Sequence, residues 1–271
     1  MLAYRCCVAL EETSSQPAVE WPLLEAQLNH SVTSESLFST LVQPNSVHVF
    51  ASQTAIKMFI KAIDSSELAQ REKLPTVSVY VCGVGATTDQ AVRSLSQLAL
   101  PTRWNFPNLG PAELRENGLH WTLEKLEKDG LVPRNDFHLW TKALSTSDKI
   151  LKELRSSRQW LNWQTYTHEI YNLSLTAKSI PHGLVIALTN KTPVCLGVKS
   201  AELLDATLAA LLEHLKRSTV SELPRNIHFS VWEKSALQRA QQLFIQSRLI
   251  PWNEFESHVN TSAAQISGVT P

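Results

Sequence analysis

The sequence lacks several features that mark common classes of protein. Its four cysteines form no CxxC pair and no zinc-binding pattern, and its nine histidines show no HExxH or other metal-ligand spacing. Lys and Arg together number 25, as do Asp and Glu, so the chain as a whole does not attract nucleic acid. These absences argue against a zinc site and against a basic nucleic-acid-binding protein. His138 and His168 are therefore predicted to be structural or surface residues.

Long hydrophobic runs are also absent. No apolar segment approaches the length of a membrane span, and the first fifteen residues have no long apolar core followed by a cleavage site. We therefore expect no signal peptide and no membrane partner. The cysteine pattern agrees with a reduced, cytoplasmic setting.

The composition that remains is that of a folded protein. Hydrophobic residues make up 43% of the 271 residues and charged residues 18%, which is enough apolar surface to build a core. This length predicts two modest domains or one large one.

The most informative stretch runs from Val77 to Leu95. Its first six residues, Val77 to Cys82, predict a buried strand, and Gly83 and Gly85 then break it. Side-chain oxygens suited to capping a helix follow on Thr87, Thr88 and Asp89. Backbone N–H groups at such a helix start can bind a carboxylate or a phosphate. The alternative is a plain connection between a strand and a helix.

The order of predicted elements is that of an α/β protein. Apolar runs predict strands at 4–10, 47–50, 77–82, 137–140, 194–198 and 227–231. Helical spacing or composition predicts helices near 34–42, 56–63, 88–98, 111–128, 145–154, 200–215 and 235–244. Residues 22–28 fit either a strand or the start of a helix. The alternation of strands with helices indicates parallel sheets.

The second half of the chain repeats the order of the first half. Each half runs strand, helix, strand and helix, and then reaches a short Trp-Asn segment, at Trp104-Asn105 and at Trp252-Asn253. This similarity predicts two domains of one fold. We therefore expect Val47–Phe50 and Ile227–Val231 to lie in separate sheets.

Four segments match, in order and spacing, the motifs of one enzyme family. Val47 to Ser52 stands where the family has a strand ending in Phe-Thr-Ser, and Val84 to Thr88 where it has a Val-Gly-x-x-Thr turn. Phe137 to Leu154, followed later by Tyr171, resembles its strand, helix and Val-Tyr crossover. Val231 to Ala240 stands where its second Gly-x-x-Thr-Ala turn belongs. Over most of its length the chain thus resembles uroporphyrinogen-III synthase, which closes the tetrapyrrole ring in haem biosynthesis.

The resemblance implies two α/β domains with parallel sheets flanked by helices. Carried onto this chain, the first domain comprises residues 1–33 and 173–271, and the second comprises residues 34–169. Two linker strands would join them, near residues 33–36 and 169–173. The expected protein is a monomer with a cleft between its domains.

The activity implied by the resemblance is that of a lyase. The enzyme cyclises hydroxymethylbilane, a linear tetrapyrrole with acetate and propionate side chains, and inverts the last pyrrole ring. Loss of hydroxide gives a reactive azafulvene cation, so no metal or organic cofactor is expected. The protein must hold the bilane in one geometry, protonate the leaving hydroxyl and keep water away from the cation.

The site residues implied by the resemblance come from the matched motifs. Tyr171 corresponds to the crossover tyrosine and is the candidate for assisting departure of the hydroxyl. The candidates for binding the substrate are Ser52, Gly85, Thr87, Thr88 and Ser235. Helix capping is the structural alternative for Ser52 and Thr88, and packing at an interdomain strand is the alternative for Tyr171.

The sequence also departs from the family pattern in the first domain. Gly197 to Ser200 stands where Ser-Pro-Ser is expected, Trp232 replaces a turn glycine, and Ser235 replaces a threonine. Positive charge in the cleft could be restored by Lys142, Lys149, Lys199 and Lys234, although lysines on helices are usually solvated. Two alternatives to the enzyme stay open, a catalytically inactive or interaction protein on the same fold and a two-domain small-molecule binding protein.

Overall fold

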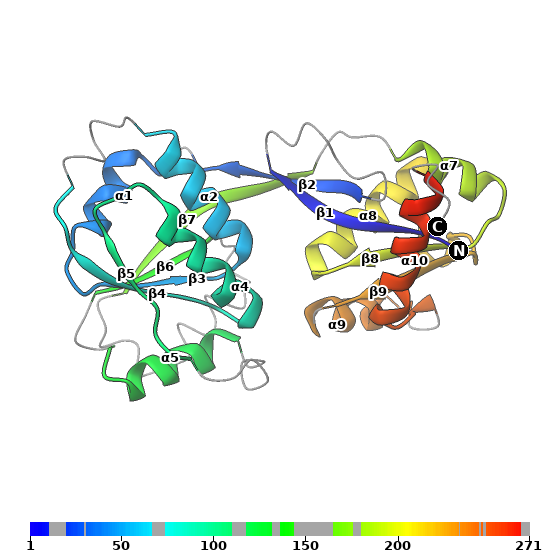
Figure 1. The fold of residues 1–271 in the computed structure, drawn as a ribbon. Coiled ribbons are helices and arrows are strands. Elements are labelled where there is room, and N and C mark those ends of the chain that lie inside the picture. Colours follow the sequence, from blue (N-terminus) through cyan, green and yellow to red (C-terminus); the bar gives the residue numbers. More distant parts are fainter. Residues whose placement is uncertain are drawn as a thin grey trace. The chain divides into compact units, whose positions relative to one another are not determined.

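The strands of the chain join into one largely parallel sheet. The computed structural model describes residues 1–10, 20–29, 31–66, 74–109, 118–131, 136–143, 165–175, 180–232, 234–243, 245 and 248–266. Within them the strand order is β5-β4-β3-β6-β7-β2-β1-β8-β9 (Figure 1). Seven neighbouring pairs have a parallel register. The predicted α/β class, with a parallel sheet and flanking helices, is therefore confirmed.

The element bounds follow the chain. The strands are β1 (Leu2–Leu10), β2 (Glu20–Leu28), β3 (Val47–Phe50), β4 (Ser78–Gly83), β5 (Arg103–Asn105), β6 (Phe137–Lys142), β7 (Thr165–Leu175), β8 (Val194–Val198) and β9 (Ile227–Val231). The α-helices are α1 (Ser34–Leu41), α2 (Gln53–Asp64), α4 (Ala86–Ala91), α5 (Gly118–Lys128), α7 (His182–Thr189), α8 (Ala201–Leu215), α9 (Lys234–Gln242) and α10 (Trp252–Ile266). Two 3₁₀ helices are η1 (Val92–Gln97) and η4 (Val220–Glu222).

The chain divides into two compact units. The first unit comprises Met1–Ala26 and Ser174–Pro271, and the second unit comprises Gln27–Leu173. The two divisions fall near the end of β2 and within β7. The chain therefore leaves the first unit along β2 and returns to it along β7.

The prediction that Val47–Phe50 and Ile227–Val231 lie in separate sheets is wrong. They form β3 and β9 of the same hydrogen-bonded sheet. The sheet is continuous because the two long strands β2 and β7 are neighbours in it. At the end of β2, the backbone N–H of Asn29 donates to the carbonyl oxygen of Ile170 at 3.0 Å.

The core of the second unit forms on both faces of β3. All four residues of this strand are buried, so both of its faces are covered. One face packs on α5 in a cluster that contains Val47, Val49, Cys82, Leu109, Leu119, Leu123, Leu126, Phe137 and Leu139. On the other face, Phe50 packs edge-on against Phe59 of α2, with ring centroids 5.3 Å apart. Figure 1 shows α2 and α5 on opposite sides of the strands.

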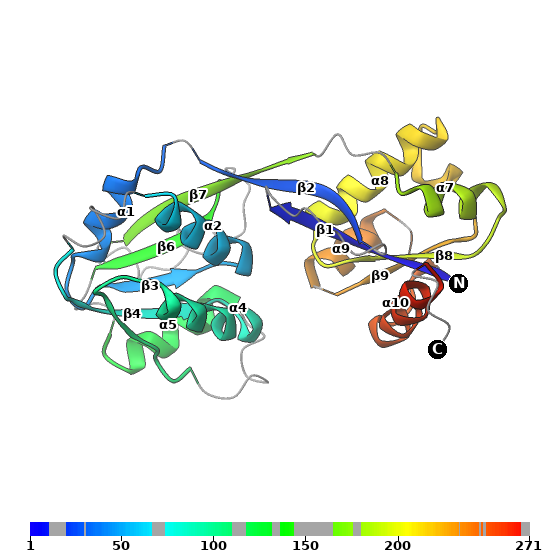
Figure 2. The ribbon, with the colours of Figure 1, turned by 45° about the horizontal axis from the view of Figure 1, so that its top comes forward.

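In the first unit, α8 and α10 cover opposite faces of β1 and β8 (Figure 2). The α10 face is a buried cluster of Ala3, Cys195, Phe255 and Val259. Side chains alternate along a strand, so Cys6 lies on the other face, where it contacts Thr207 of α8. The two helices therefore bury both sides of the parallel strands between them.

Gly197 in β8 allows α10 to pack closely. A Cβ atom at this position would lie 2.1 Å from Cζ of the fully buried Phe255. We expect Gly197→Ala to lower the free energy of unfolding by about 1–3 kcal/mol, the usual cost of overpacking a core. Urea unfolding at neutral pH measures this change. Adding Phe255→Leu should recover part of the loss, whereas an unfolding midpoint unchanged in Gly197→Ala would contradict the close packing.

Residues 22–28, which fitted either a strand or a helix start, belong to the strand β2. The helix expected at 145–154 lies outside the described residues. The sequence missed α7 because its residues HGLVIALT are mostly apolar and show no clear helical periodicity.

The two Trp-Asn segments are not equivalent. Trp104-Asn105 lies in β5, whereas Trp252-Asn253 opens α10. Pro251 precedes the first helical residue, and its fixed φ suits a helix start. In the described part of the first unit, the segment before Trp252 forms an isolated parallel bridge, between Phe229 and Leu249, where the second unit has the strand β5.

Candidate functional site

The carboxyl ends of β3 and β4 lie side by side in the second unit. Phe50 of β3 pairs with Gly83 of β4, so the segments that follow the two strands start from the same edge of the sheet. Ligands of parallel α/β sheets bind at this edge. Of the predicted binding residues, Ser52 and Gly85 directly precede α2 and α4, and Thr87 and Thr88 lie in the first turn of α4.

Ser52 caps α2 and also contacts Tyr171. Its Oγ accepts a hydrogen bond from the backbone N–H of Ala55 at 3.1 Å. The same Oγ lies 3.1 Å from the phenol oxygen of Tyr171, 119 positions away in the sequence. A hydroxyl can donate one hydrogen bond while it accepts another, so either oxygen can be the donor in this pair. The structure therefore brings the predicted binding serine and the predicted catalytic tyrosine together.

A β-bulge in β7 decides the direction of the Tyr171 side chain. β6 and β7 pair in step as far as Thr141 and Glu169, after which Lys142 pairs with Tyr171. The extra residue, Ile170, shifts the alternation of side chains and turns Tyr171 toward the α2 face. Tyr171 is only 4% exposed, so its ring is packed and its hydroxyl reaches Ser52 at the edge of the sheet.

The turn after β4 is closed by Asp89. Its Oδ1 accepts a hydrogen bond from the backbone N–H of Gly83 at 3.2 Å. A Cβ atom at position 83 would lie 2.4 Å from the backbone nitrogen of Asp89 and from the carbonyl carbon of Thr88. Only glycine allows α4 to approach the strand end this closely.

The predicted capping role of Thr87, Thr88 and Asp89 is wrong. Helix α4 begins earlier, at Ala86, and its N-cap is Gly85, which makes no side-chain cap. Gly85 has φ of +78°, in the left-handed region that glycine adopts without strain. The helix is six residues long and continues as the 3₁₀ helix η1.

A side chain joins the starts of α2 and α4. Nε2 of Gln53, the first residue of α2, donates to the carbonyl oxygen of Thr87 at 3.2 Å. Ser52 and Gly85 are half-buried and Thr87 is exposed, so all three are open to a ligand. Thr88 is 8% exposed, so its hydroxyl is largely shielded. The edge therefore offers Ser52, Gly85 and Thr87 more directly than Thr88.

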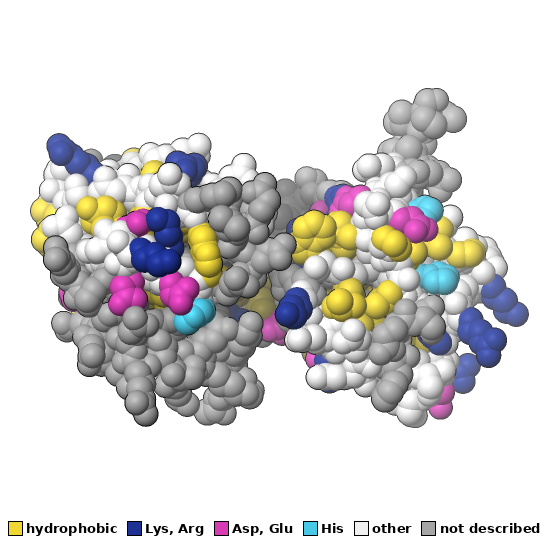
Figure 3. Space-filling view, turned by 90° about the horizontal axis from the view of Figure 1, so that it is seen from below, with side chains coloured by type: hydrophobic (Ala, Val, Ile, Leu, Met, Phe, Trp, Pro, Cys, Tyr) yellow, Lys and Arg dark blue, Asp and Glu magenta, His cyan; other side chains and the backbone are white. Residues whose placement is uncertain are grey.

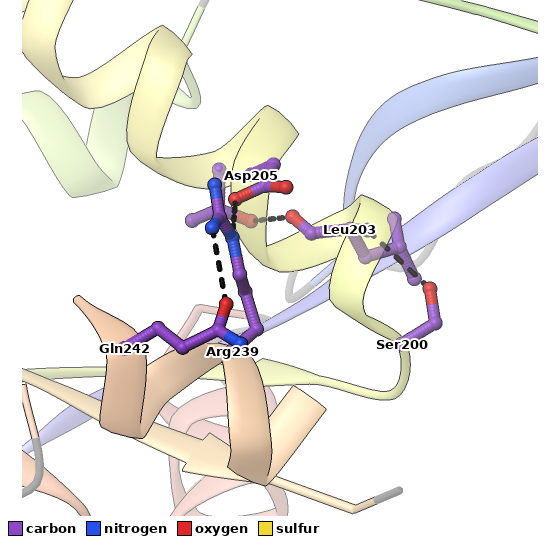
Figure 4. Close-up of polar contacts among 6 residues, drawn as sticks. Ser200, Leu203, Asp205, Arg239 and Gln242 are labelled. Atoms are coloured by element: carbon purple, nitrogen blue, oxygen red, sulfur yellow. Dashed lines mark hydrogen bonds and ion pairs between the residues drawn. The ribbon is translucent and has the colours of Figure 1, made fainter. Parts of the chain in front are cut away.

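At the corresponding edge of the first unit, Ser200 caps α8. Its Oγ accepts a hydrogen bond from the backbone N–H of Leu203 at 3.3 Å (Figure 4). Nearby, Nε of Arg239 in α9 donates to Oδ1 of Asp205 in α8 at 2.8 Å. Nη1 of Arg239 donates to Oε1 of Gln242 at 3.3 Å, and Figure 4 shows both contacts. Arg239 is thus engaged in joining two helices.

The first unit also contains Ser235 and two of the lysines considered above. Ser235 belongs to α9, but its side chain lies outside the described residues, so its binding role stays a prediction. Lys199 and Lys234 are exposed, whereas Lys149 lies outside the described residues. Lys142, in the second unit, is half-buried.

A stack of aromatic rings crosses β3, β6 and β7. The imidazoles of His48 and His138 lie 4.7 Å apart between ring centroids, and His138 stacks on Tyr166 at 5.0 Å. Trp140 stacks on His168 at 4.2 Å. The structural interpretation of His138 is confirmed, because this side chain is 1% exposed. Sequence reasoning missed the stack itself, because the ring pairs come from three strands that are distant in sequence.

Hydrogen bonds determine the tautomer of His48. Nε1–H of Trp140 donates to Nδ1 of His48 at 3.0 Å, so this nitrogen carries no proton. The proton therefore lies on Nε2, which donates to Oγ of Ser46 at 2.9 Å. Burial, with smaller contributions from the neighbouring His138 and His168, lowers the pKa of His48 well below its ordinary value.

The other two histidines form a second chain of hydrogen bonds. Nε2–H of His138 donates to Oε1 of Gln43 at 2.9 Å, so Nδ1 of His138 accepts from Nε2–H of His168, also at 2.9 Å. Burial, followed by the neighbouring His168, lowers the pKa of His138 to about 4. Burial alone lowers the pKa of His168 to about 4. The stack is therefore neutral at pH 7.

The described part of the chain contains no group of three or more His, Cys, Asp or Glu side chains placed to hold a metal ion. None of its helices is both long and apolar enough to cross a bilayer. Figure 3 shows both basic and acidic side chains on each unit.

Comparison with known proteins finds solved structures of the same fold. No protein-family model and no curated protein matches the sequence. Among solved structures, uroporphyrinogen-III synthetase from Helicobacter pylori matches with a TM-score of 0.50 and 14% identity, over 90% of this chain and 92% of that one. A mutant uroporphyrinogen III synthase from Thermus thermophilus matches with a TM-score of 0.45 and 12% identity, over 97% and 99% of the two chains. The Helicobacter likeness covers nearly all of both chains, and it shows that this chain shares the fold of uroporphyrinogen-III synthase, as the four sequence motifs predicted.

Proposed function

We propose that this chain cyclises hydroxymethylbilane to uroporphyrinogen III, with inversion of the last pyrrole ring. The shared fold supports the proposal, but the contact between Ser52 Oγ and the Tyr171 phenol carries it. The family resemblance implies substrate binding for the first residue and catalysis for the second. Their contact depends on two separate local features, the cap of α2 and the bulge of β7.

The proposal includes the domain arrangement that the resemblance implies. Residues 1–33 with 173–271 would form one domain and residues 34–169 the other. The division of the chain into two compact units supports this part of the proposal, although the first unit leaves off at Ala26 instead of residue 33. We propose further that the enzyme acts as a cytoplasmic monomer.

Substrate binding would use the edge of the sheet where α2 begins. The bilane carries acetate and propionate groups, and the first N–H groups of the twelve-residue α2 have no partner within the helix. The helix dipole adds partial positive charge at the same place. Ser52, Gly85, Thr87 and Thr88 would contribute hydroxyl and backbone groups there, and Ser235 would contribute from the first unit.

Tyr171 would assist departure of the hydroxyl. When Ser52 Oγ donates its proton to the phenol oxygen, the phenol O–H acts as a donor toward the leaving group. The phenol gives its proton to the leaving oxygen and becomes a phenolate. The carbon–oxygen bond then breaks, water departs, and the azafulvene cation remains. The cation is formed by the substrate itself, so the reaction needs no metal or organic cofactor.

A second candidate is a non-catalytic binding or interaction protein on the same fold. The observations that favour it are the shielding of Tyr171 and Thr88, which are 4% and 8% exposed. The exposed Trp232 in place of a turn glycine also departs from the family pattern. The two candidates differ in whether the chain controls how the bilane closes.

An assay with freshly generated hydroxymethylbilane separates these candidates. Spontaneous closure gives uroporphyrinogen I, and only controlled inversion gives the III isomer. After oxidation, chromatography measures the ratio of the two isomers with the protein present and with heat-denatured protein. We expect the III isomer to dominate with the native chain. Formation of the I isomer alone would exclude the proposed enzyme and favour the binding protein.

A further inference from the structure

Trp232 is an exposed aromatic side chain at the carboxyl end of β9. It is the first residue after this strand, and 61% of its surface is accessible. Its backbone N–H donates to the carbonyl oxygen of Val198, the last residue of β8, at 3.1 Å. The backbone of Trp232 is therefore held at the edge of the sheet where ligands of parallel α/β proteins bind.

The indole ring of Trp232 is supported by other aromatic rings. It meets Trp252 edge-on, with ring centroids 5.2 Å apart and an interplanar angle of 62°. Trp252 in turn contacts Phe255 at 5.0 Å, and Phe255 is fully buried against Gly197. A continuous row of rings thus leads from the core to the surface. The exposed surface of Trp232 therefore belongs to a side chain that is packed against Trp252 at this edge of the sheet.

A lysine lies at the same edge. Val198 pairs with Val231 in parallel register, so Lys199 and Trp232 follow directly from paired residues. Lys199 is exposed. An aromatic ring and an ammonium group are therefore presented from neighbouring strand ends, a combination suited to a planar ring that carries a carboxylate.

We propose that Trp232 and Lys199 form a subsite for one pyrrole ring of the bilane, and this inference rests on the proposed function. The pyrrole stacks on the indole, and its acetate or propionate pairs with the ammonium of Lys199. Each pyrrole of the substrate carries both features, a planar ring and carboxylates. The subsite gives the first unit a means of holding the substrate in a place where the family motif is lost.

Porphobilinogen tests the subsite directly, because it is a single pyrrole with one acetate and one propionate group. The full chain is labelled with ¹⁵N at the indole nitrogen of tryptophan, and the Trp232→Phe spectrum assigns the Trp232 signal. Titration with porphobilinogen is expected to shift the signals of Trp232 and Trp252 in a saturable way. An absence of any shift at Trp232 would overturn the subsite.

Variants separate stacking from charge. Trp232→Ser is expected to raise the Kd for porphobilinogen about 3- to 30-fold, while Trp232→Phe keeps a stacking ring and most of the affinity. Lys199→Gln should weaken binding and reduce its dependence on salt. Ile186→Ser is the matched control, because Ile186 is an exposed apolar residue of α7, 47% accessible, in the same unit. Equal affinity for all four variants and the wild type would overturn the proposal.

The cyclisation assay distinguishes failure of the subsite from failure of the enzyme. If the wild type makes the III isomer and Trp232→Ser leaves KM unchanged, the enzyme stands and the subsite is excluded. If no III isomer forms but porphobilinogen shifts the Trp232 signal, the chain binds pyrroles without being the synthase.

Sedimentation tests whether a second copy of the chain covers Trp232 instead of a pyrrole. Self-association that Trp232→Ser abolishes, without a porphobilinogen shift, would overturn the subsite.

Discussion

Replacing Tyr171 by phenylalanine is expected to lower the turnover of hydroxymethylbilane by up to about 100-fold. The substitution removes the O–H and keeps the buried ring, so it tests proton donation apart from packing. A phenol holds its proton until about pH 10, so at neutral pH it serves as a donor to the departing hydroxyl. General acid catalysis contributes roughly 10²- to 10⁴-fold to a reaction rate. Because the bilane also ionises spontaneously, we expect the loss of turnover in Tyr171→Phe to lie at or below the lower end of this range. The III isomer should still predominate, because inversion depends on how the substrate is held.

Single-turnover and steady-state rates at saturating bilane measure this effect. Tyr166→Phe is a suitable control, because Tyr166 lies in the same strand and stacks on His138 instead of contacting Ser52. Ser52→Ala removes the partner of the phenol and is also expected to cost about 1 kcal/mol of stability through loss of the α2 cap. Full activity of Tyr171→Phe at saturation would assign Tyr171 to packing and leave water or a substrate carboxyl as the acid.

Acidification from pH 6.5 toward pH 4 is expected to destabilise the folded chain. In the unfolded chain histidine titrates near 6.5, whereas burial holds the pKa of His138 and of His168 at about 4 in the folded one. Between these values the unfolded chain binds protons that the folded chain does not, so the free energy of unfolding falls as the pH falls. Full stability is present above pH 6.5, and His138 alone accounts for a loss of about 3 kcal/mol by pH 4. His168 contributes less because it is partly exposed, and His48 adds to the effect in the same direction.

Urea unfolding followed by circular dichroism, from about pH 7 to about pH 4, measures this dependence. His138→Gln removes one buried imidazole. The free energy of unfolding should therefore depend less steeply on pH, by about one proton, even though the variant is less stable at every pH. His120→Gln is the control, since that ring is 56% exposed and lies outside the stack. A slope that His138→Gln leaves unchanged would show that another group takes up the protons.

The sequence alone was enough to predict most of the local structure. The apolar run at Val47–Phe50 formed a buried strand, and the alanine- and leucine-rich segment formed the long helix α8. These predictions succeed because burial and helix propensity act over a few residues. The capping prediction at Thr88 failed because it used only residues that are neighbours in the sequence. The close packing of α4 on Gly83 selects Gly85 as the N-cap, and this packing is not a local property.

By itself, the sequence determined the α/β order, the family resemblance and the residues at the edge of the sheet that were worth testing. Only the tertiary structure decided which of them meet. Tyr171 reaches Ser52 because one extra residue in β7 shifts its register against β6, and no local pattern records that shift. The pairing of β2 with β7 likewise joined all strands into one sheet, where the repeated halves had predicted two. Register and strand pairing depend on contacts between segments far apart in the chain, whereas propensity and hydrophobic periodicity describe only neighbours.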